Sequence, residues 1–208
     1  MCIARALGVS VRHADDQGAF LVAGHGRAVY PGSVCWIEVS STDPGGGRDF
    51  YAGLMGWTYQ IDRGRGHDAT ALCAGWLVAG LAGVAVAAGH VAWTVYLTSA
   101  SITHTAAVFT QWGGQVLHGP VDVSEHGRVS SGRIRPGVCS VWQPATPWTF
   151  RTTTPGSLFW AELNTWHGAL ADKIFTTLFG YRQKQIGDGV DLDYTTWSRG
   201  GQMMLGRL

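Results

Sequence analysis

The sequence has little lysine and no cluster of positive charge. Lysine occurs only at Lys173 and Lys184, and arginine supplies the remaining basic side chains without forming a run. The formal net charge of the 208 residues is +1 at pH 7. A protein that binds nucleic acid through its phosphates carries a basic patch or stripe, so the sequence predicts no nucleic-acid partner.

Cysteine is scarce and widely spaced. The four cysteines, Cys2, Cys35, Cys73 and Cys139, form no C-x-x-C pair and no zinc-finger spacing. We expect reduced thiols that pack as small hydrophobic side chains. The N-terminal residues also lack the apolar run of a secretory signal, because Arg12 interrupts them early. The sequence therefore predicts a cytoplasmic protein.

Charged residues are missing altogether from Ala69 to Val121. The segment LCAGWLVAGLAGVAVAAG within this stretch is long enough to raise the alternative of a membrane span. We favour two buried strands joined by a linker rich in Gly and Ala, because the repeat described next places strand ends here. No membrane association is therefore expected.

A short strand-like pattern occurs three times. The segments CWIEV, AWTVYL and FWAEL each carry a tryptophan that is followed twenty positions later by a glycine. The three pairs are Trp36 and Gly56, Trp93 and Gly113, and Trp160 and Gly180. A spacing that is kept three times indicates an internal structural repeat.

Each repeat predicts the same order of elements. The predicted first strands, at 34–40, 91–98 and 157–163, precede helices predicted at 44–55, 101–112 and 168–179. The repeated glycine ends each helix, and Thr42-Asp43-Pro44 supplies the first helix with a capping residue and an initial proline. Three short strands are predicted after each glycine, so each repeat is a βαβββ unit.

The segment VCWIEVSSTDPGGGRDFYAGLMGW resembles the vicinal oxygen chelate superfamily, which includes glyoxalase I, bleomycin-resistance proteins and extradiol dioxygenases. With VAWTVYL and GGQVLHGPVDVSEHGRVSSG, it is more closely similar to the two-domain glyoxalase-like proteins of actinobacteria. The similarity runs from about Tyr30 to the C-terminus. It implies an α+β fold in which βαβββ units form a curved mixed sheet, a half-barrel, around a pocket.

The resemblance implies four units, whereas three are found here. We expect an N-terminal extension at 1–29, a glyoxalase-like domain of two units at 30–146, and an unpaired third unit at 147–208. Residues 8–24 are similar to the closing hairpin of a unit. One hypothesis is that this hairpin borders the third unit, in the same chain or in a homodimer, and the alternative is that it packs elsewhere.

The resemblance also implies where a metal would bind. Metal-dependent members hold a divalent ion through His or Gln on first strands and Glu on last strands. Alignment on the T-x-D-P turn places Trp36, Trp93 and Trp160 at the first-strand positions, with Ser140 and Leu21 at last-strand positions. Indole offers no lone pair to a metal, and a serine hydroxyl is a poor single ligand. We therefore expect no metal cofactor.

Histidine is the remaining source of metal ligands. The eight histidines show no H-x-H, H-x-x-x-H or H-E-x-x-H spacing. His104 and His167 are expected on the surface or at helix starts. His118 and His126 flank a loop and are the strongest alternative ligands.

Strand alternation places Glu38 on the face of Trp36, and Glu162 on the face of Trp160. A carboxyl group beside an indole in an apolar site can have a raised pKa and act as a general acid or base, which makes Glu38 the candidate catalytic residue. The alternative is a carboxylate bound to backbone amides or arginine. A ligand site that favours flat, conjugated molecules would be lined by Trp36, Trp93, Ser140, Trp142, Trp160 and Glu162, although each indole could instead fill the core.

Three classes of function are compatible with these residues. The first is a metal-free protein that binds an aromatic natural product, as in drug sequestration or bleomycin-type resistance. The second is an enzyme of the same fold, either a metal-independent isomerase or cyclase of secondary metabolism that uses Glu38, or a metal-dependent lyase or dioxygenase. The third is a structural or interaction module.

Overall fold

The computed structural model describes residues 11–12, 20–22, 28–61, 69–84, 91–123, 126–134, 137–145 and 150–208. All three repeats are βαβββ modules, and their strands form mixed sheets, so the predicted α+β fold is confirmed. We call them module 1 (residues 34–83), module 2 (93–144) and module 3 (162–207). No helix among the described residues is long and apolar enough to cross a membrane.

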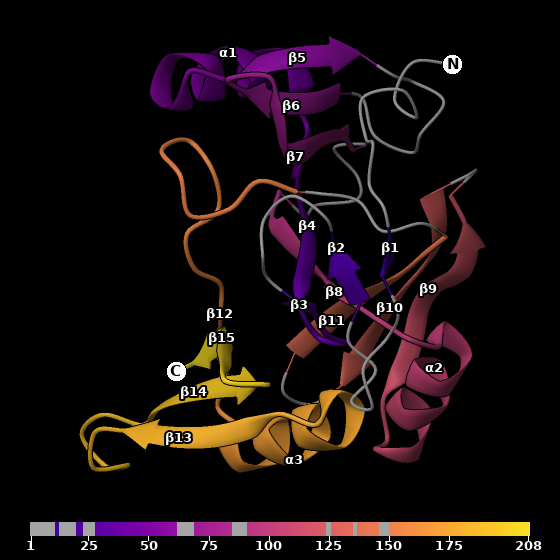
Figure 1. Ribbon diagram of the computed structural model, residues 1–208, viewed down its shortest axis with the longest axis vertical. Coiled ribbons are helices and arrows are strands. Elements are labelled where there is room, and N and C mark those ends of the chain that lie inside the picture. The colour runs from indigo at the N-terminus through magenta and orange to yellow at the C-terminus, as the bar shows by residue number, and fades with distance from the viewer. Residues whose placement is uncertain are drawn as a thin grey trace. The chain divides into compact units, whose positions relative to one another are not determined.

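Module 1 begins with an eight-residue strand and a helix whose bounds match the prediction. The Asp43 side chain accepts a hydrogen bond from the backbone N of Gly46 at 2.9 Å and caps the helix, which ends at Gly56 with φ of 68°. The strand order is β5-β6-β7-β4, and β4 runs parallel to β7 (Figure 1). The elements are β4 (Val34–Ser41), α1 (Pro44–Met55), β5 (Thr58–Ile61), β6 (Ala69–Cys73) and β7 (Trp76–Gly83). The predicted buried strand in the uncharged stretch is β7, which is buried from Val78 to Ala82.

Module 2 repeats this order with a shorter helix. Ser101 caps α2, and the Gln143 side chain accepts a hydrogen bond from the backbone N of Ile102 at 3.0 Å. The helix lies against β9 and β10 (Figure 1). The elements are β8 (Trp93–Thr98), α2 (Ile102–Gln111), β9 (Gln115–Asp122), β10 (Gly127–Ile134) and β11 (Gly137–Pro144), in the strand order β8-β11-β10-β9.

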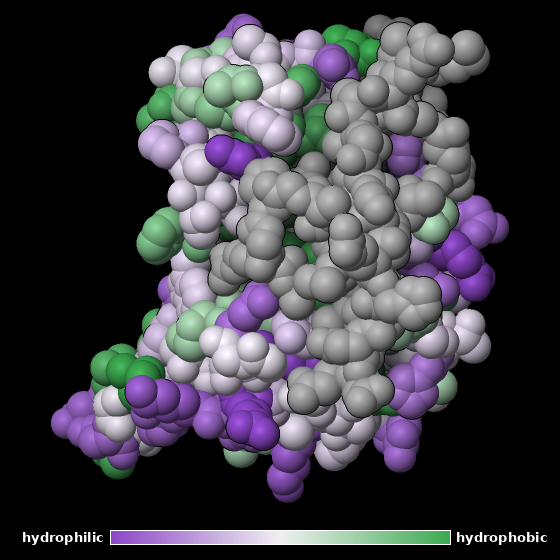
Figure 2. Space-filling view, in the orientation of Figure 1, coloured by the Kyte–Doolittle hydropathy of each residue, from purple (hydrophilic) through white to green (hydrophobic). Residues whose placement is uncertain are grey.

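Module 3 has the predicted helix but a much shorter first strand. The strand predicted at 157–163 is limited to Glu162 and Leu163, and among the described residues it pairs with β15 alone. The ring of Phe175 on α3 stacks with the rings of Tyr181 and Trp197. The elements are β12 (Glu162–Leu163), α3 (Gly168–Phe179), β13 (Arg182–Ile186), β14 (Tyr194–Arg199) and β15 (Gln202–Arg207), in the order β12-β15-β14-β13. The surface around β13 is mostly hydrophilic (Figure 2).

The predicted N-terminal hairpin is present. Strand β1 (Val11–Arg12) pairs antiparallel with β2 (Phe20–Val22), and β3 (Ala28–Val29) adds a third strand. The turn of this hairpin lies outside the described residues. In the described residues the hairpin pairs with β3, and its association with module 3 stays a prediction.

The chain divides into two compact units. The larger unit contains residues 1–34, 97–148 and 160–208, and the smaller unit contains residues 35–96 and 149–159. Module 1 thus forms most of the smaller unit, and modules 2 and 3 lie mainly in the larger one. The sequence predicted one domain of modules 1 and 2 at 30–146 and a separate third unit at 147–208. This division stays a prediction.

Two turns of nearly the same sequence each precede a module of one unit but belong to the other unit. The first P-G-S turn (Tyr30–Ser33) precedes module 1 but belongs to the larger unit, and the second P-G-S turn (Thr154–Ser157) precedes module 3 but belongs to the smaller unit. In both turns, the serine N donates to the carbonyl of the first residue, at 2.9 Å and 3.0 Å. The serine hydroxyl in turn accepts from the first residue's backbone N, at 3.0 Å and 2.9 Å.

Each P-G-S turn docks on an aromatic side chain through its glycine. The Tyr181 hydroxyl donates to the carbonyl of Gly32, and the Trp57 indole N donates to the carbonyl of Gly156 at 2.6 Å. Both glycines have positive φ, 92° and 76°. Gly156 follows Gly32 by 124 positions and Tyr181 follows Trp57 by the same 124, so modules 1 and 3 make equivalent contacts with the turn of the other.

Candidate functional site

The candidate site is built on β4 and β7 in the smaller compact unit. Glu38 lies directly opposite Gly80 in the parallel pairing of these strands. A Cβ atom placed on Gly80 would lie 3.0 Å from Oε2 of Glu38 and 3.1 Å from Nε1 of Trp36. Both side chains therefore lean over β7 on one face of the sheet, as strand alternation predicted.

Tyr96 on β8 is the third polar group of this site. Its hydroxyl donates a hydrogen bond to Oε1 of Glu38 at 3.5 Å. Glu38 and Tyr96 are both partly buried, and Trp36 is buried to 6% exposure. The site thus joins a carboxyl group, a phenol and an indole on adjacent strands.

Burial governs the protonation of Glu38. Loss of hydration raises the pKa of its carboxyl group to about 7, and the hydrogen bond from Tyr96 opposes this rise. Burial also raises the pKa of the Tyr96 phenol, and the neighbouring Glu38 charge adds to this effect. At neutral pH both the neutral and the ionised form of the carboxyl group are populated, and the phenol keeps its proton and donates a hydrogen bond. Such a pair can exchange a proton with a ligand.

The segment that connects modules 2 and 3 packs on the site. The ring of Phe150 lies 5.7 Å from the ring of Trp36, and the backbone N of Arg151 donates to the carbonyl of Leu77 on β7 at 2.9 Å. The Arg151 guanidinium group lies 4.9 Å from the ring centre of Trp76. This segment therefore packs Phe150 on Trp36 and places the cation of Arg151 on Trp76.

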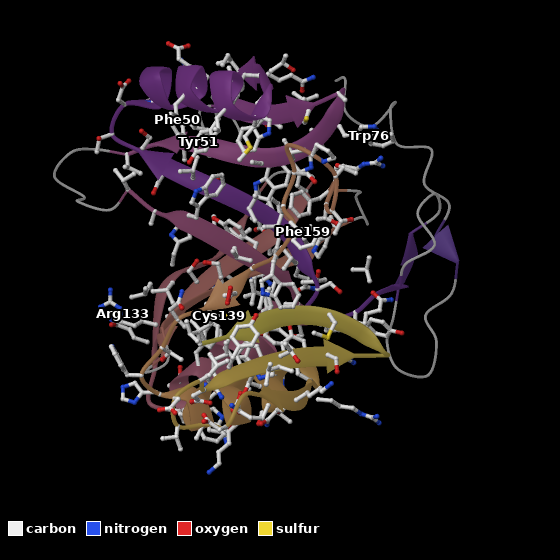
Figure 3. All side chains as sticks on the ribbon, turned by 90° about the vertical axis from the view of Figure 1, so that its left-hand side faces the viewer. Phe50, Tyr51, Trp76, Arg133, Cys139 and Phe159 are labelled. Carbon is white, nitrogen blue, oxygen red and sulfur yellow. The ribbon has the colours of Figure 1, made fainter. Side chains whose placement is uncertain are left out.

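Trp93 is not brought to Glu38. Its ring packs against Tyr51 at 5.5 Å and Trp57 at 6.4 Å, which places it on the α1 side of the sheet, near Tyr51 as labelled in Figure 3. Alternation along β8 turns Thr94 and Tyr96 toward Glu38 and turns Trp93 away. The predicted equivalence of Trp93 and Trp36 is therefore wrong, and a contact of Trp93 with a ligand stays a prediction.

The cause of this error is a one-residue shift between modules 1 and 2. The helix caps Asp43 and Ser101 are 58 positions apart, whereas Trp36 and Trp93 are 57 apart. Helix α2 has 10 residues, whereas α1 has 12. The shorter helix offsets the displaced strand, so the tryptophan and the glycine stay twenty positions apart in both modules. A shift of one residue moves every side chain of a strand to its other face.

Module 3 holds a second copy of the Trp-x-Glu arrangement. Glu162 lies opposite Gly206 on β15, and a Cβ atom on Gly206 would lie 3.0 Å from Nε1 of Trp160. The Trp160 indole donates to the Tyr194 hydroxyl at 2.9 Å, and Glu162 is exposed. Trp160 and Glu162 are thus placed as in module 1, but the carboxyl group faces water.

Ser140 and Trp142 share the face of β11 opposite to Gln143, whose side chain accepts from the first residue of α2. The hydroxyl groups of Ser140 and Ser131 are 2.8 Å apart, and the Trp142 indole donates to the carbonyl of His126 at 3.1 Å. Both residues belong to the larger unit. Their predicted role in ligand binding stays a prediction.

The described residues at the expected ligand positions do not suit a divalent metal. Trp36, Thr94 and Trp160 occupy the first-strand positions, and no group of three His, Cys, Asp or Glu side chains gathers anywhere in the described part of the chain. His104 and His167 are exposed at the starts of α2 and α3, as expected. His13, His25, His67 and His90 lie outside the described residues, as do the side chains of Leu21 and the hairpin.

Sequence reasoning missed Tyr96, Gly80 and Phe150. An alignment of the helix caps, in place of the tryptophans, would have matched Tyr96 with Glu38 because both precede their cap by five positions. Gly80 and Phe150 carry no such signal, since their roles depend on which strand and segment pack on β4.

Comparison of the sequence with known proteins gives two related matches. The chain is 29% identical over 153 residues to the anthracycline biosynthesis protein DnrV of Streptomyces peucetius and, to the same extent, to the anthracycline biosynthesis protein DauV of Streptomyces sp. (strain C5). Each alignment covers 65% of this chain and 56% of the relative, so the chain spans about half the length of these proteins. No family model matches the chain.

Solved structures with the same fold include a glyoxalase and a dioxygenase. The Mn(II)-bound glyoxalase from Novosphingobium aromaticivorans matches with a TM-score of 0.64 and 14% identity, over 86% of this chain and 62% of that one. A variant of homoprotocatechuate 2,3-dioxygenase from Brevibacterium fuscum matches with a TM-score of 0.59 and 13% identity, over 88% and 55% of the two chains. At these identities the likeness shows the fold alone.

Proposed function

We propose that this chain, which has the fold of the vicinal oxygen chelate superfamily, binds a flat aromatic natural product on the face formed by Trp36, Glu38 and Tyr96. The Streptomyces relatives named for anthracycline biosynthesis support a polycyclic quinone or phenol of secondary metabolism as the ligand class. The Trp36 indole can stack on such rings, but it is 6% exposed and packs against Phe150 at 5.7 Å, so the ligand would have to displace the Phe150 ring.

The placement of Glu38, partly buried beside Trp36 and hydrogen-bonded to Tyr96, is the observation that carries this proposal. Its pKa of about 7 keeps a large share of the carboxyl groups neutral at physiological pH. A neutral carboxyl group donates one hydrogen bond and accepts another, so it can pair with a hydroxyl or carbonyl oxygen on an aromatic ring. The Tyr96 hydroxyl donates to Oε1 of Glu38 at 3.5 Å and orients the carboxyl group. A neutral carboxyl group oriented in this way suits an uncharged ligand.

The same pKa favours a second candidate, a metal-independent isomerase or cyclase. A carboxyl group that titrates near neutral pH can accept a proton from one carbon or oxygen of a substrate and return it to another. Tyr96 would then stabilise the ionised form of Glu38 through its hydrogen bond. Binding and proton transfer use the same residues and differ in whether the ligand leaves unchanged.

We also propose that neither function uses a metal at the usual position of this fold. The support is the chemistry of the side chains there, since indole and threonine replace the imidazole, amide and carboxylate groups that hold divalent ions. Metal analysis of the purified protein tests this point. A stoichiometric amount of Mn, Fe, Ni or Zn would contradict it.

Ligand binding is tested by tryptophan fluorescence with an anthracycline aglycone as the probe. We expect saturable quenching, and we expect Trp36→Phe to weaken binding at least tenfold, about 1.4 kcal/mol. Trp166→Phe is the matched control, because Trp166 is wholly exposed at the surface of module 3. Equal affinity in the Trp36→Phe variant and the parent protein would contradict the assigned face.

Mass spectrometry of the recovered probe separates the two candidates. An unchanged mass and an unchanged chromatographic position after incubation support binding alone. An isomerised or cyclised product that disappears with Glu38→Gln, while the variant still quenches fluorescence, supports the enzyme.

A further inference from the structure

The segment from Phe150 to Phe159 belongs to the same compact unit as Trp36 and contacts module 1 along its length. Its first two residues, Phe150 and Arg151, contact β4 and β7. The residues after them lead into the second P-G-S turn. We call Phe150 and Arg151 the cover segment, and residues 152–158 the anchor segment.

The anchor segment is held firmly on module 1. The backbone N of Thr153 donates to the carbonyl of Leu158 at 2.7 Å, and the indole of Trp57, which is 5% exposed, donates to the carbonyl of Gly156 at 2.6 Å. Thr153 has φ of 61°, a left-handed conformation that is strained for a β-branched residue. Such strain persists only where the surrounding contacts enforce it, so the anchor segment is fixed in this position.

The cover segment lies on the sheet through contacts that water can reach. The backbone N of Arg151 donates to the carbonyl of Leu77 at 2.9 Å, and its guanidinium group lies 4.9 Å from the ring centre of Trp76. Trp76 is 43% exposed, and a cation–π contact at an exposed site is weak. Phe150 and Arg151 are themselves only partly buried. The cover segment can therefore leave the sheet while the anchor segment stays in place.

The Phe150 ring occupies part of the Trp36 indole. The two ring centres are 5.7 Å apart and the ring planes are inclined by 58°. A tilted phenyl ring covers less of an indole than a flat ring system that stacks parallel to it. A fused-ring ligand therefore gains more contact with Trp36 than the departure of Phe150 removes. A single-ring ligand only replaces one ring by another of the same size.

We propose that Phe150 is a displaceable cover of the Trp36 face, and that it selects fused-ring ligands over single-ring ones. The cover segment opens by release of Arg151 from β7, with the anchor segment as the fixed base of the movement. Phe150 thereby determines which ligands bind, because each of them must replace its contact with Trp36. The selection rests on the proposed function, whereas the opening requires no ligand.

Amide hydrogen exchange of the ligand-free protein, followed by NMR, tests the opening. After correction for intrinsic rates, the amide of Arg151 should exchange at least about tenfold faster than that of Thr153, because local opening breaks only the first of these hydrogen bonds. Phe150→Ala should speed the exchange at Arg151 further and leave Thr153 unchanged. Phe159→Ala is the matched control, since the Phe159 side chain is 80% exposed (Figure 3), and it should change neither rate. Equal protection of the two amides in the parent protein overturns the proposal, and this comparison needs no variant that folds.

Binding of two probes tests the selection. Phe150→Ala should bind an anthracycline aglycone about fivefold more tightly than the parent does, because no aromatic pair has to be broken first. Catechol, a single-ring probe, should give saturable fluorescence quenching with Phe150→Ala and none with the parent. Equal aglycone affinity in the two proteins, or saturable catechol binding by the parent, contradicts the cover. Absence of aglycone binding in both proteins contradicts the proposed function instead, and the exchange at Arg151 then decides whether the cover segment opens.

Discussion

Glu38 on β4 lies opposite Gly80 on β7, and its Oε2 atom fills the space where a side chain of residue 80 would begin. The same glycine accommodates the indole of Trp36. The candidate acid and its aromatic neighbour therefore depend on a position that has no side chain.

Replacement of Glu38 by glutamine should remove a pH dependence of stability. The folded-state pKa of about 7 lies above the ordinary value of 4.5, so the folded protein binds more protons than the unfolded one between these values. Stability should therefore fall as pH rises from 4.5 to 7, by about 3 kcal/mol at most. Urea unfolding at several pH values measures this slope, which Glu38→Gln should flatten and the exposed-site control Glu162→Gln should keep. An equal slope in Glu38→Gln would refute the burial of a titrating carboxyl group at this position.

Replacement of Gly80 by alanine should disturb the site directly. The new methyl group would lie 3.0 Å from Glu38 and 3.1 Å from Trp36, and we expect a loss of about 1–3 kcal/mol together with weaker ligand binding. Gly53→Ala in α1 is the control, because its Cβ position has no neighbour within 4 Å. That change should be neutral or stabilise the helix by up to about 1 kcal/mol. Thermal unfolding compares the two, and equal effects would argue against the close approach at Gly80.

Replacement of Tyr96 by phenylalanine should raise the pKa of Glu38 further. The Tyr96 hydroxyl donates to the Glu38 carboxyl group and lowers its pKa, so its loss removes the interaction that favours the ionised form. Titration of the Glu38 carboxyl carbon by NMR measures the shift. Tyr194→Phe in module 3 is the control and should leave the pKa of Glu38 unchanged. A fall of this pKa in Tyr96→Phe would contradict the hydrogen bond.

A side chain added at the glycine of either P-G-S turn should lower the stability of the protein. A Cβ atom on Gly156, which has φ of 76°, would lie 2.7 Å from Sγ of Cys73. Gly201 has the same φ of 76° but no neighbour within 4 Å, so Gly201→Ala isolates the backbone strain, about 1–2 kcal/mol. We expect Gly156→Ala to cost more than this control in chemical denaturation. Equal costs would mean that the turn can move away from Trp57 without loss.

The sequence by itself determined the local parts of the molecule. Asp43, Pro44 and Gly56 specify the beginning and end of α1, and the repeated glycine at Gly180 ends α3, whose predicted bounds are also correct. Caps and turns depend on neighbours in the chain, which the sequence displays directly. The alternation that places Trp36 and Glu38 on one face is a property of a single strand, so it too could be predicted.

The tertiary structure decided which residues from other elements meet that face. The identical spacing of twenty residues suggested that Trp93 matches Trp36, but the shorter helix α2 shifts the strand and presents Tyr96 instead. The strand predicted at 157–163 is short because strand length depends on pairing, and within the described parts of the chain β12 pairs with β15 only. The raised pKa of Glu38 arises from burial beneath groups distant in the sequence. Pairing and burial are set by contacts between distant segments, and for that reason only the folded chain reveals them.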